Sequence, residues 1–174
     1  GEKYPYPTFI QSQSADAVVN YPAETLINPK FRLAQVRSGD ILISRGGIFS
    51  SALIARMPDV DAQFSHMAIV YIDPLDGKKY TIEAHIEVGA IIIPFEEYFK
   101  DGKSRSSIYR YHDPKMAHAA AFEMFKRVGT NMLKGKNVPY DFKMLSNDHT
   151  ELFCSEVIRE GFQTATNNQV LVPL

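Results

Sequence analysis

Hydrophobic and polar positions alternate most regularly near the middle of the chain, and this pattern predicts a β-sheet. In segment 80–86 the apolar residues occupy one face of a strand, and Thr81, Glu83 and His85 occupy the other. Segment 66–72 is a nearly continuous apolar run, which is typical of a central strand buried on both faces. Shorter apolar runs predict three further strands, at 41–44, 90–93 and 107–111.

Helical spacing predicts helices before and after these strands. Apolar residues recur at helical intervals in 48–57, at most one short helix fits 9–19, and Pro94 opens another that runs through Phe99. Asp113 is the expected N-cap of a long helix, followed by Pro in its first turn. Its predicted buried stripe consists of Ala121, Phe122, Phe125, Val128 and Met132. The elements together predict an α+β fold, an antiparallel sheet packed with helices.

The chain is expected to form one globular domain. It has 174 residues, of which 45% are hydrophobic, enough to bury a core. Four prolines break up residues 1–30, so we expect residues 1–38 to be an N-terminal lead-in packed on a domain that spans 39–174.

Charge and cysteine content exclude several classes of protein. Lys and Arg number 19 against 20 Asp and Glu, and this near balance argues against nucleic-acid binding. No apolar run reaches the roughly 20 residues that a transmembrane helix needs. One cysteine allows no disulfide within the chain, which suits the cytoplasm and equally an envelope protein with one catalytic thiol.

The single cysteine, Cys154, is the candidate nucleophile. It lies at the start of a short amphipathic helix that Asp148 or Thr150 is expected to cap, and a helix N-terminus should make the thiol more acidic. A distant histidine, His66, begins the central strand and is the candidate base. A buried structural cysteine is the competing interpretation, because free cysteines are among the most buried residues.

A catalytic histidine needs a partner at its other ring nitrogen, and the next strand offers two. Glu83 would stabilise an imidazolium better, whereas His85 would orient it without adding charge. The same side chains, His66, Glu83, His85 and Cys154, are also possible zinc ligands, although closely spaced ligand pairs are otherwise lacking.

Five segments carry a resemblance to a known family. They are 39–42, 64–70, 82–84, 140–142 and 153–157, and they resemble the YiiX/YebB-like branch of the NlpC-type cysteine peptidases. These are circularly permuted papain-like domains related to lecithin–retinol acyltransferase, with the histidine before the cysteine. The resemblance covers about residues 39–162, and the histidine-strand and cysteine-helix motifs are its specific part.

The resemblance implies a cysteine hydrolase with Cys154 as nucleophile, His66 as base and Glu83 as third residue. Tyr140 would border the substrate or assist the oxyanion, and His85 has no assigned equivalent and is grouped with the substrate-binding residues. No cofactor and no metal are implied.

The expected substrate is a cell-wall peptide, another amide or a lipid acyl group, cleaved through an acyl-thioester. A catalytically idle module that binds a peptide or lipid is the alternative. Relatives suggest the bacterial periplasm or cell envelope after removal of a signal peptide; the cytoplasm and the oligomeric state stay open.

Overall fold

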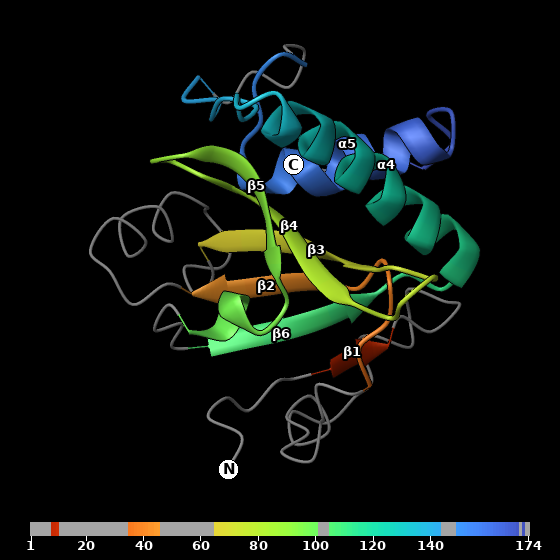
Figure 1. Ribbon diagram of the computed structural model, residues 1–174. Helices are drawn as coiled ribbons and strands as arrows, with labels where there is room; N and C mark the ends of the chain where they lie inside the picture. Colours follow the sequence, from red (N-terminus) through yellow and green to blue (C-terminus); the bar gives the residue numbers. More distant parts are fainter. Residues whose placement is uncertain are drawn as a thin grey trace.

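Among the residues that the computed structural model describes (8–10, 35–45, 65–100, 105–143, 149–170 and 172), six strands form one sheet in the order β1-β6-β2-β3-β4-β5 (Figure 1). Their bounds are β1 Thr8–Ile10, β2 Ile41–Arg45, β3 His66–Ile72, β4 Lys79–His85, β5 Gly89–Pro94 and β6 Arg105–Arg110. The neighbours from β6 to β5 all run antiparallel, whereas β1 pairs with β6 in parallel.

The register of the sheet brings polar residues together at one end of it. Ser44 of β2 lies opposite His66 of β3 on one side and opposite Ser106 of β6 on the other. Ala68, two residues after His66, lies opposite Glu83 of β4. Because side chains alternate along a strand, His66, Ala68 and Glu83 belong to the same face of the sheet.

Each face of the sheet has its own hydrophobic cluster. The helix-side cluster joins Ile69, Tyr71, Ile82 and Ala84 of the strands to the two long helices. The opposite face is covered by the far-side cluster, which consists of Val36, Leu42, Ala68, Val70, Phe95, Tyr98, Phe99 and Ile108. The polar end of the sheet therefore lies between two packed layers.

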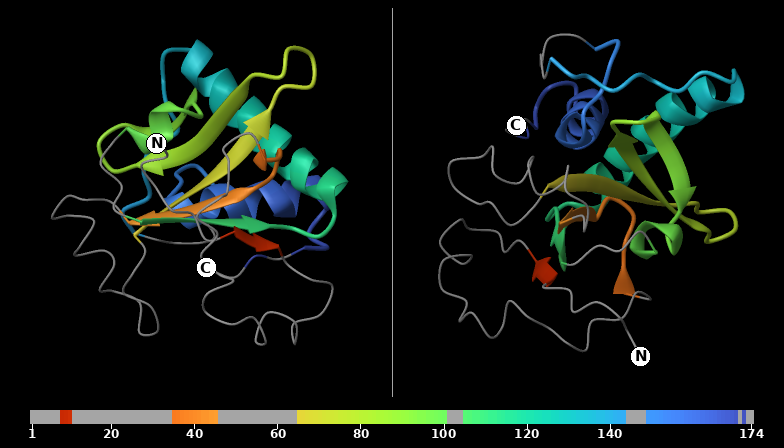
Figure 2. Two further views of the ribbon diagram at one scale, coloured as in Figure 1. Left: turned by 90° about the horizontal axis from the view of Figure 1, so that it is seen from below. Right: turned by 90° about the vertical axis from the view of Figure 1, so that its left-hand side faces the viewer.

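Two helices, α4 (Pro114–Leu133) and α5 (Cys154–Ala165), cover one face of the sheet (Figures 1 and 2). The side chain of Asp113 accepts hydrogen bonds from the N–H groups of Lys115 and Met116, a cap worth about 1 kcal/mol. The two helices pack closely at Gly161, where an added Cβ would lie only 2.8 Å from the Ala120 carbonyl oxygen.

The structure confirms the α+β class and the antiparallel sheet packed with helices, as well as the Asp113 cap. The buried stripe of α4 agrees with the prediction only in part, at Ala121 and Val128. Ala117, Ala120 and Met124 face the core, whereas Phe122 is 42% exposed. Close contact with α5 requires small side chains at the helix crossing, so alanines take the place expected for aromatic residues.

Three local predictions are wrong. Phe9 and Ile10 belong to β1 and not to a helix. Only η2 (Glu97–Phe99), a single 3-10 turn, follows β5 in place of a helix from Pro94. The N-cap of the cysteine helix is Phe153 and not Thr150, and Asp148 lies outside the described residues.

The helix predicted at 48–57 and most of the lead-in at 1–38 also lie outside the described residues, so the division at residue 38 stays a prediction. In the part of the chain that the structure describes, neither helix is long and apolar enough to cross a membrane.

Candidate active site

Cys154 is the first residue of α5. The chain turns into the helix at Phe153, whose N–H donates to a carboxylate oxygen of Glu156 at 3.2 Å. The thiol lies against the backbone N–H groups of Met67, Ser155 and Cys154 itself. Met67 is the residue after His66, so α5 delivers the thiol to the start of the histidine strand.

The acidity of the thiol is opposite to the sequence-based expectation. Burial raises the pKa of Cys154 above its ordinary value, and the negative charge of Glu83 adds to this. The three backbone N–H groups favour the thiolate but do not outweigh burial. The cysteine is therefore a protonated thiol at neutral pH, and it would need a base to act as a nucleophile.

His66 is held by a buried carboxylate. Its Nε2 lies 2.5 Å from Oε2 of Glu83, whose side chain is 0% exposed. Burial by itself would raise the pKa of Glu83, but hydrogen bonds from His66 and His85 and their charges lower it to about 2. Glu83 is thus ionised at neutral pH and can stabilise positive charge on the imidazole.

His85 shares the same carboxylate oxygen. Its Nε2 lies 3.1 Å from Oε2 of Glu83, and its ring centroid lies 4.9 Å from that of His66. The two residues that the sequence offered as partners of His66 therefore form one chain of contacts, in which Glu83 bonds His66 directly and His85 bonds Glu83. The other oxygen of Glu83, Oε1, is buried and has no hydrogen-bond partner.

The same three side chains could hold a metal ion. One ligand atom from each of His66, Glu83 and His85 lies within 4.8 Å of the other two, and two imidazoles with a carboxylate are a donor set that suits zinc. Cys154, which the sequence placed in the same possible zinc site, is not a member of this group.

Tyr140 lies beside the thiol on a well-anchored segment. Val138 accepts a hydrogen bond from Ala90 of β5 at 2.8 Å, and Leu152, two residues before Cys154, donates to the Pro139 carbonyl at 2.9 Å. Burial first, and then the negative charges that Cys154, Asp141 and Glu87 carry at the high pH where the hydroxyl titrates, raise the pKa of Tyr140 to about 12. Its hydroxyl keeps its proton and can donate a hydrogen bond.

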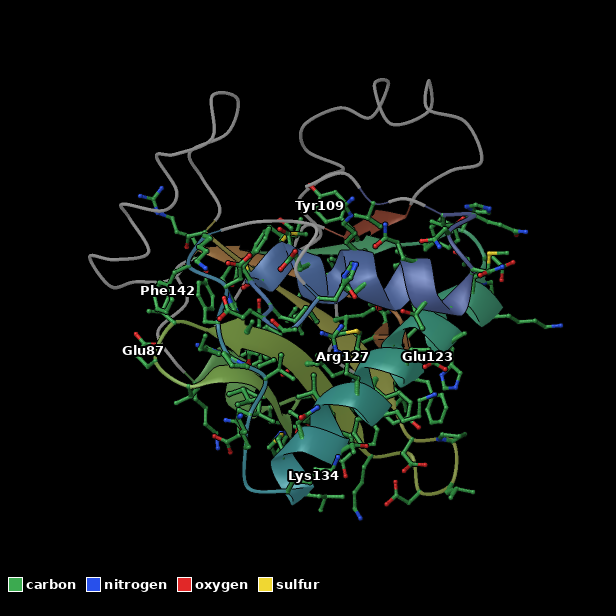
Figure 3. The ribbon with its side chains drawn as sticks, turned by 90° about the horizontal axis from the view of Figure 1, so that it is seen from above. Glu87, Tyr109, Glu123, Arg127, Lys134 and Phe142 are labelled. Atoms are coloured by element: carbon green, nitrogen blue, oxygen red, sulfur yellow. The ribbon has the colours of Figure 1, made fainter. Side chains whose placement is uncertain are left out.

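The rim beside this segment carries both apolar and charged groups. Phe142 is 69% exposed, and its ring lies 5.2 Å from that of Tyr140. Glu87, in the turn between β4 and β5, lies on the same side of the molecule as Phe142 (Figure 3). An exposed aromatic ring and a carboxylate therefore lie on the side of the molecule that carries Tyr140.

Two neighbours of His66 carried no signal in the sequence. The ring of Tyr98 stacks against His66 at a centroid distance of 6.1 Å, and the Tyr98 hydroxyl donates to Ser44 Oγ at 2.8 Å. Tyr98 follows an irregular turn after β5, so no strand or helix period relates it to the histidine. Only the folded chain brings them together.

Comparison with solved structures shows a protein of similar fold. The chain is similar to a crystal structure of the metalloprotein YiiX from Escherichia coli O157:H7, with 23% identity, a TM-score of 0.56, and coverage of 76% of this chain and 68% of that one. At this identity the likeness concerns the fold. None of the curated proteins matches the chain.

A protein family, by contrast, matches most of the sequence. The family of permuted papain-like amidases, described as YaeF/YiiX and C92, matches residues 35–172, which include Cys154, His66, Glu83, His85 and Tyr140. The chain therefore belongs to the permuted papain-like amidase family.

Proposed function

We propose that the protein hydrolyses an amide bond with Cys154 as nucleophile, His66 as base and Glu83 as the residue that orients His66. The observation that carries the proposal is the hydrogen bond between His66 and the buried, ionised Glu83, at 2.5 Å. His66 directly precedes Met67, whose backbone N–H contacts the thiol of Cys154. Such a carboxylate fixes the ring and stabilises the imidazolium that forms during the reaction.

The first half of the reaction forms an acyl-thioester. Because Nε2 of His66 is bound to Glu83, the other ring nitrogen, Nδ1, takes the proton from Cys154 Sγ as the sulfur attacks the carbonyl carbon. The carbonyl π bond becomes an oxyanion, for which the Cys154 N–H and the Tyr140 hydroxyl are the proposed donors. The C–N bond then breaks, and the amine leaves with the proton from His66.

The second half releases the acid. Water attacks the thioester carbonyl, gives a proton to His66, and expels the sulfur, which regains a proton from the imidazolium. The raised pKa of Cys154 means that proton transfer accompanies attack in this mechanism, because no stable thiolate exists beforehand.

Trapping the acyl-enzyme tests this proposal. Incubation with p-nitrophenyl acetate, whose leaving group makes acylation fast, is expected to add one acetyl group to the peptide containing Cys154, as measured by mass spectrometry after acid quench. Hydroxylamine should remove the group because thioesters are cleaved by it. The wild-type chain has a single cysteine, so the adduct has one possible thioester position.

Follow-up with N-acyl p-nitroanilides would establish amide cleavage. Release of nitroaniline without any adduct at Cys154 would contradict the thioester route. Neither an adduct nor a product, together with tight binding of an amide, would favour the idle binding module.

A second candidate function is zinc binding by His66, Glu83 and His85, favoured by the spacing of their ligand atoms and by the description of the similar YiiX structure as a metalloprotein. Two atoms bound tetrahedrally to one zinc ion lie about 3.3 Å apart. The observed nitrogen-to-oxygen distances of 2.5 Å and 3.1 Å are shorter, so the hydrogen-bonded side chains would have to separate. Bound zinc would occupy His66 and so compete with its role as base.

We expect added zinc to inhibit hydrolysis. We expect treatment with a chelator, which removes metal ions, to leave the rate of hydrolysis undiminished. His85→Ala should weaken zinc inhibition at least tenfold, because it removes one of three ligands. His118→Ala is the matched control, since that histidine bonds Ser38 Oγ and is not a member of the metal-ligand group. Loss of hydrolysis in EDTA that zinc restores would instead favour a metal-dependent activity.

A further inference from the structure

The His66 side chain and the Cys154 thiol start from opposite faces of the sheet. Strand alternation assigns its side chain to the face of the sheet that also carries Ala68, Val70 and Glu83, whereas α5 and its thiol belong to the helix side. The ring must therefore stay at the end of the sheet to face Cys154, and not turn into the far-side layer. The space beneath it decides which of these positions it can take.

Tyr98 occupies that space. It is 0% exposed, and its ring lies 6.1 Å from His66 with an angle of 25° between the ring planes. It also packs edge-on against Phe99, at a centroid distance of 5.0 Å, within the far-side cluster. The imidazole thus has a fixed aromatic wall on the side facing away from the helices.

A hydrogen bond fixes the wall itself. The Tyr98 hydroxyl donates to Ser44 Oγ at 2.8 Å, and Ser44 is the strand neighbour of His66 in the register of β2 and β3. Ser44 is 0% exposed, so water does not compete for this bond. The position of the Tyr98 ring is therefore tied to the same strand pair that carries the histidine.

We propose that Tyr98 is a positioning residue, which keeps the His66 ring aligned between Glu83 and the cysteine. The inference rests on the proposed function, and it adds a side chain that acts through its contact with His66. Removing the Tyr98 ring would open a cavity into which the imidazole can rotate, which breaks the alignment of its two nitrogens. Removing only the hydroxyl would loosen the ring without opening the cavity.

The first measurement is the nuclear magnetic resonance signal of the His66 Nε2 proton, which a short bond to a buried carboxylate shifts downfield. We expect this signal in the wild type and in Tyr98→Phe, and expect its loss by exchange broadening in Tyr98→Leu. Tyr71→Leu is the matched control, because Tyr71 is a buried tyrosine of the helix-side cluster and packs on Phe125. Tyr71→Leu should destabilise the fold to a similar degree yet keep the signal.

A second pair of variants avoids a large change in the core. Ser44→Ala removes the acceptor of the Tyr98 hydroxyl, whereas Ser106→Ala removes an equally buried hydroxyl that has no hydrogen-bond partner. We expect Ser44→Ala and Tyr98→Phe to broaden the signal to the same small extent. The double variant should broaden the signal no more than either single change does, because each change removes the same bond between Tyr98 and Ser44. Ser106→Ala should behave as the wild type.

Alkylation of Cys154 by iodoacetamide at pH 7 connects positioning to chemistry. The part of the alkylation rate that depends on His66 is the difference between the wild type and His66→Ala. We expect Tyr98→Leu to lower this part about tenfold and Tyr98→Phe to lower it about twofold. Wild-type alkylation indifferent to His66→Ala would refute the proposed function, while the proton signal would still decide the role of Tyr98. If Tyr98→Leu folds and keeps the wild-type proton signal, the inference is overturned. If Tyr98→Leu does not fold, the inference is overturned when the proton signal of Ser44→Ala equals that of Ser106→Ala.

Discussion

Cys154→Ala is expected to abolish hydrolysis, lowering kcat by about 10⁴-fold or more while the fold is kept. The sulfur is the proposed atom that bonds to the substrate, and no neighbouring group can replace it. The partly buried thiol contributes little packing, so we expect the free energy of unfolding to change by about 1 kcal/mol or less. Steady-state kinetics with an N-acyl p-nitroanilide and urea unfolding measure the two effects.

Histidine variants provide the matched comparison. His66→Ala should lower kcat by about 10³-fold or more, because the protonated thiol then has no base. His118→Ala removes a histidine that is also partly buried and hydrogen-bonded, to Ser38 Oγ at 2.8 Å, and should leave kcat near the wild-type value. Substantial turnover by Cys154→Ala, or equal losses in the two histidine variants, would contradict the proposed mechanism.

Glu83→Gln is expected to lower kcat by about 10²-fold, less than His66→Ala does. Glutamine can still accept a hydrogen bond from one histidine, but it carries no charge to stabilise the imidazolium. Glu160→Gln is the matched control: Glu160 also accepts hydrogen bonds from a histidine, His149, and from Arg127, which lies on the side of α4 facing α5 (Figure 3). A silent Glu83→Gln combined with a severe loss in His85→Ala would make His85 the functional partner.

Glu83 should also give the protein a characteristic acid sensitivity. Its pKa falls from the ordinary 4.5 to about 2 on folding, so the folded state binds fewer protons in this range. The stabilisation is therefore fully present above pH 4.5 and is lost as the pH falls from 4.5 toward 2. At 1.36 kcal/mol per pKa unit the loss is about 3 kcal/mol.

Urea unfolding in the presence of EDTA, at pH 6 and at pH 3, measures this dependence. Glu83→Gln should be less stable than the wild type at pH 6 and should approach it at pH 3, because the unfolded wild-type chain then binds a proton at Glu83 whereas the folded chain does not. A constant difference between the two proteins over this pH range would show that the charge of Glu83 does not contribute.

The parts of the fold that depend on local pattern could be predicted from the sequence. Alternation in 80–86 and the apolar run at 66–72 correspond to β4 and β3, and the Asp113-Pro114 pair marks the start of α4. Strands and caps depend on residues close together in the chain, so their signal is present before folding. The buried face of α4 was predicted only in part, because its contact with α5 depends on the small residue Gly161 in another helix.

The sequence alone also determined which residue types were available for chemistry: one thiol, a histidine at the start of the central strand, and Glu83 and His85 on one face of the next. Tertiary structure alone decided how they connect. Strand register placed Glu83 between two histidines, and η2 brought Tyr98 beneath His66. Burial raised the pKa of the thiol, which is opposite to the effect expected of a helix N-terminus. These features are contacts and desolvation among distant segments, and neither quantity exists until the chain has folded.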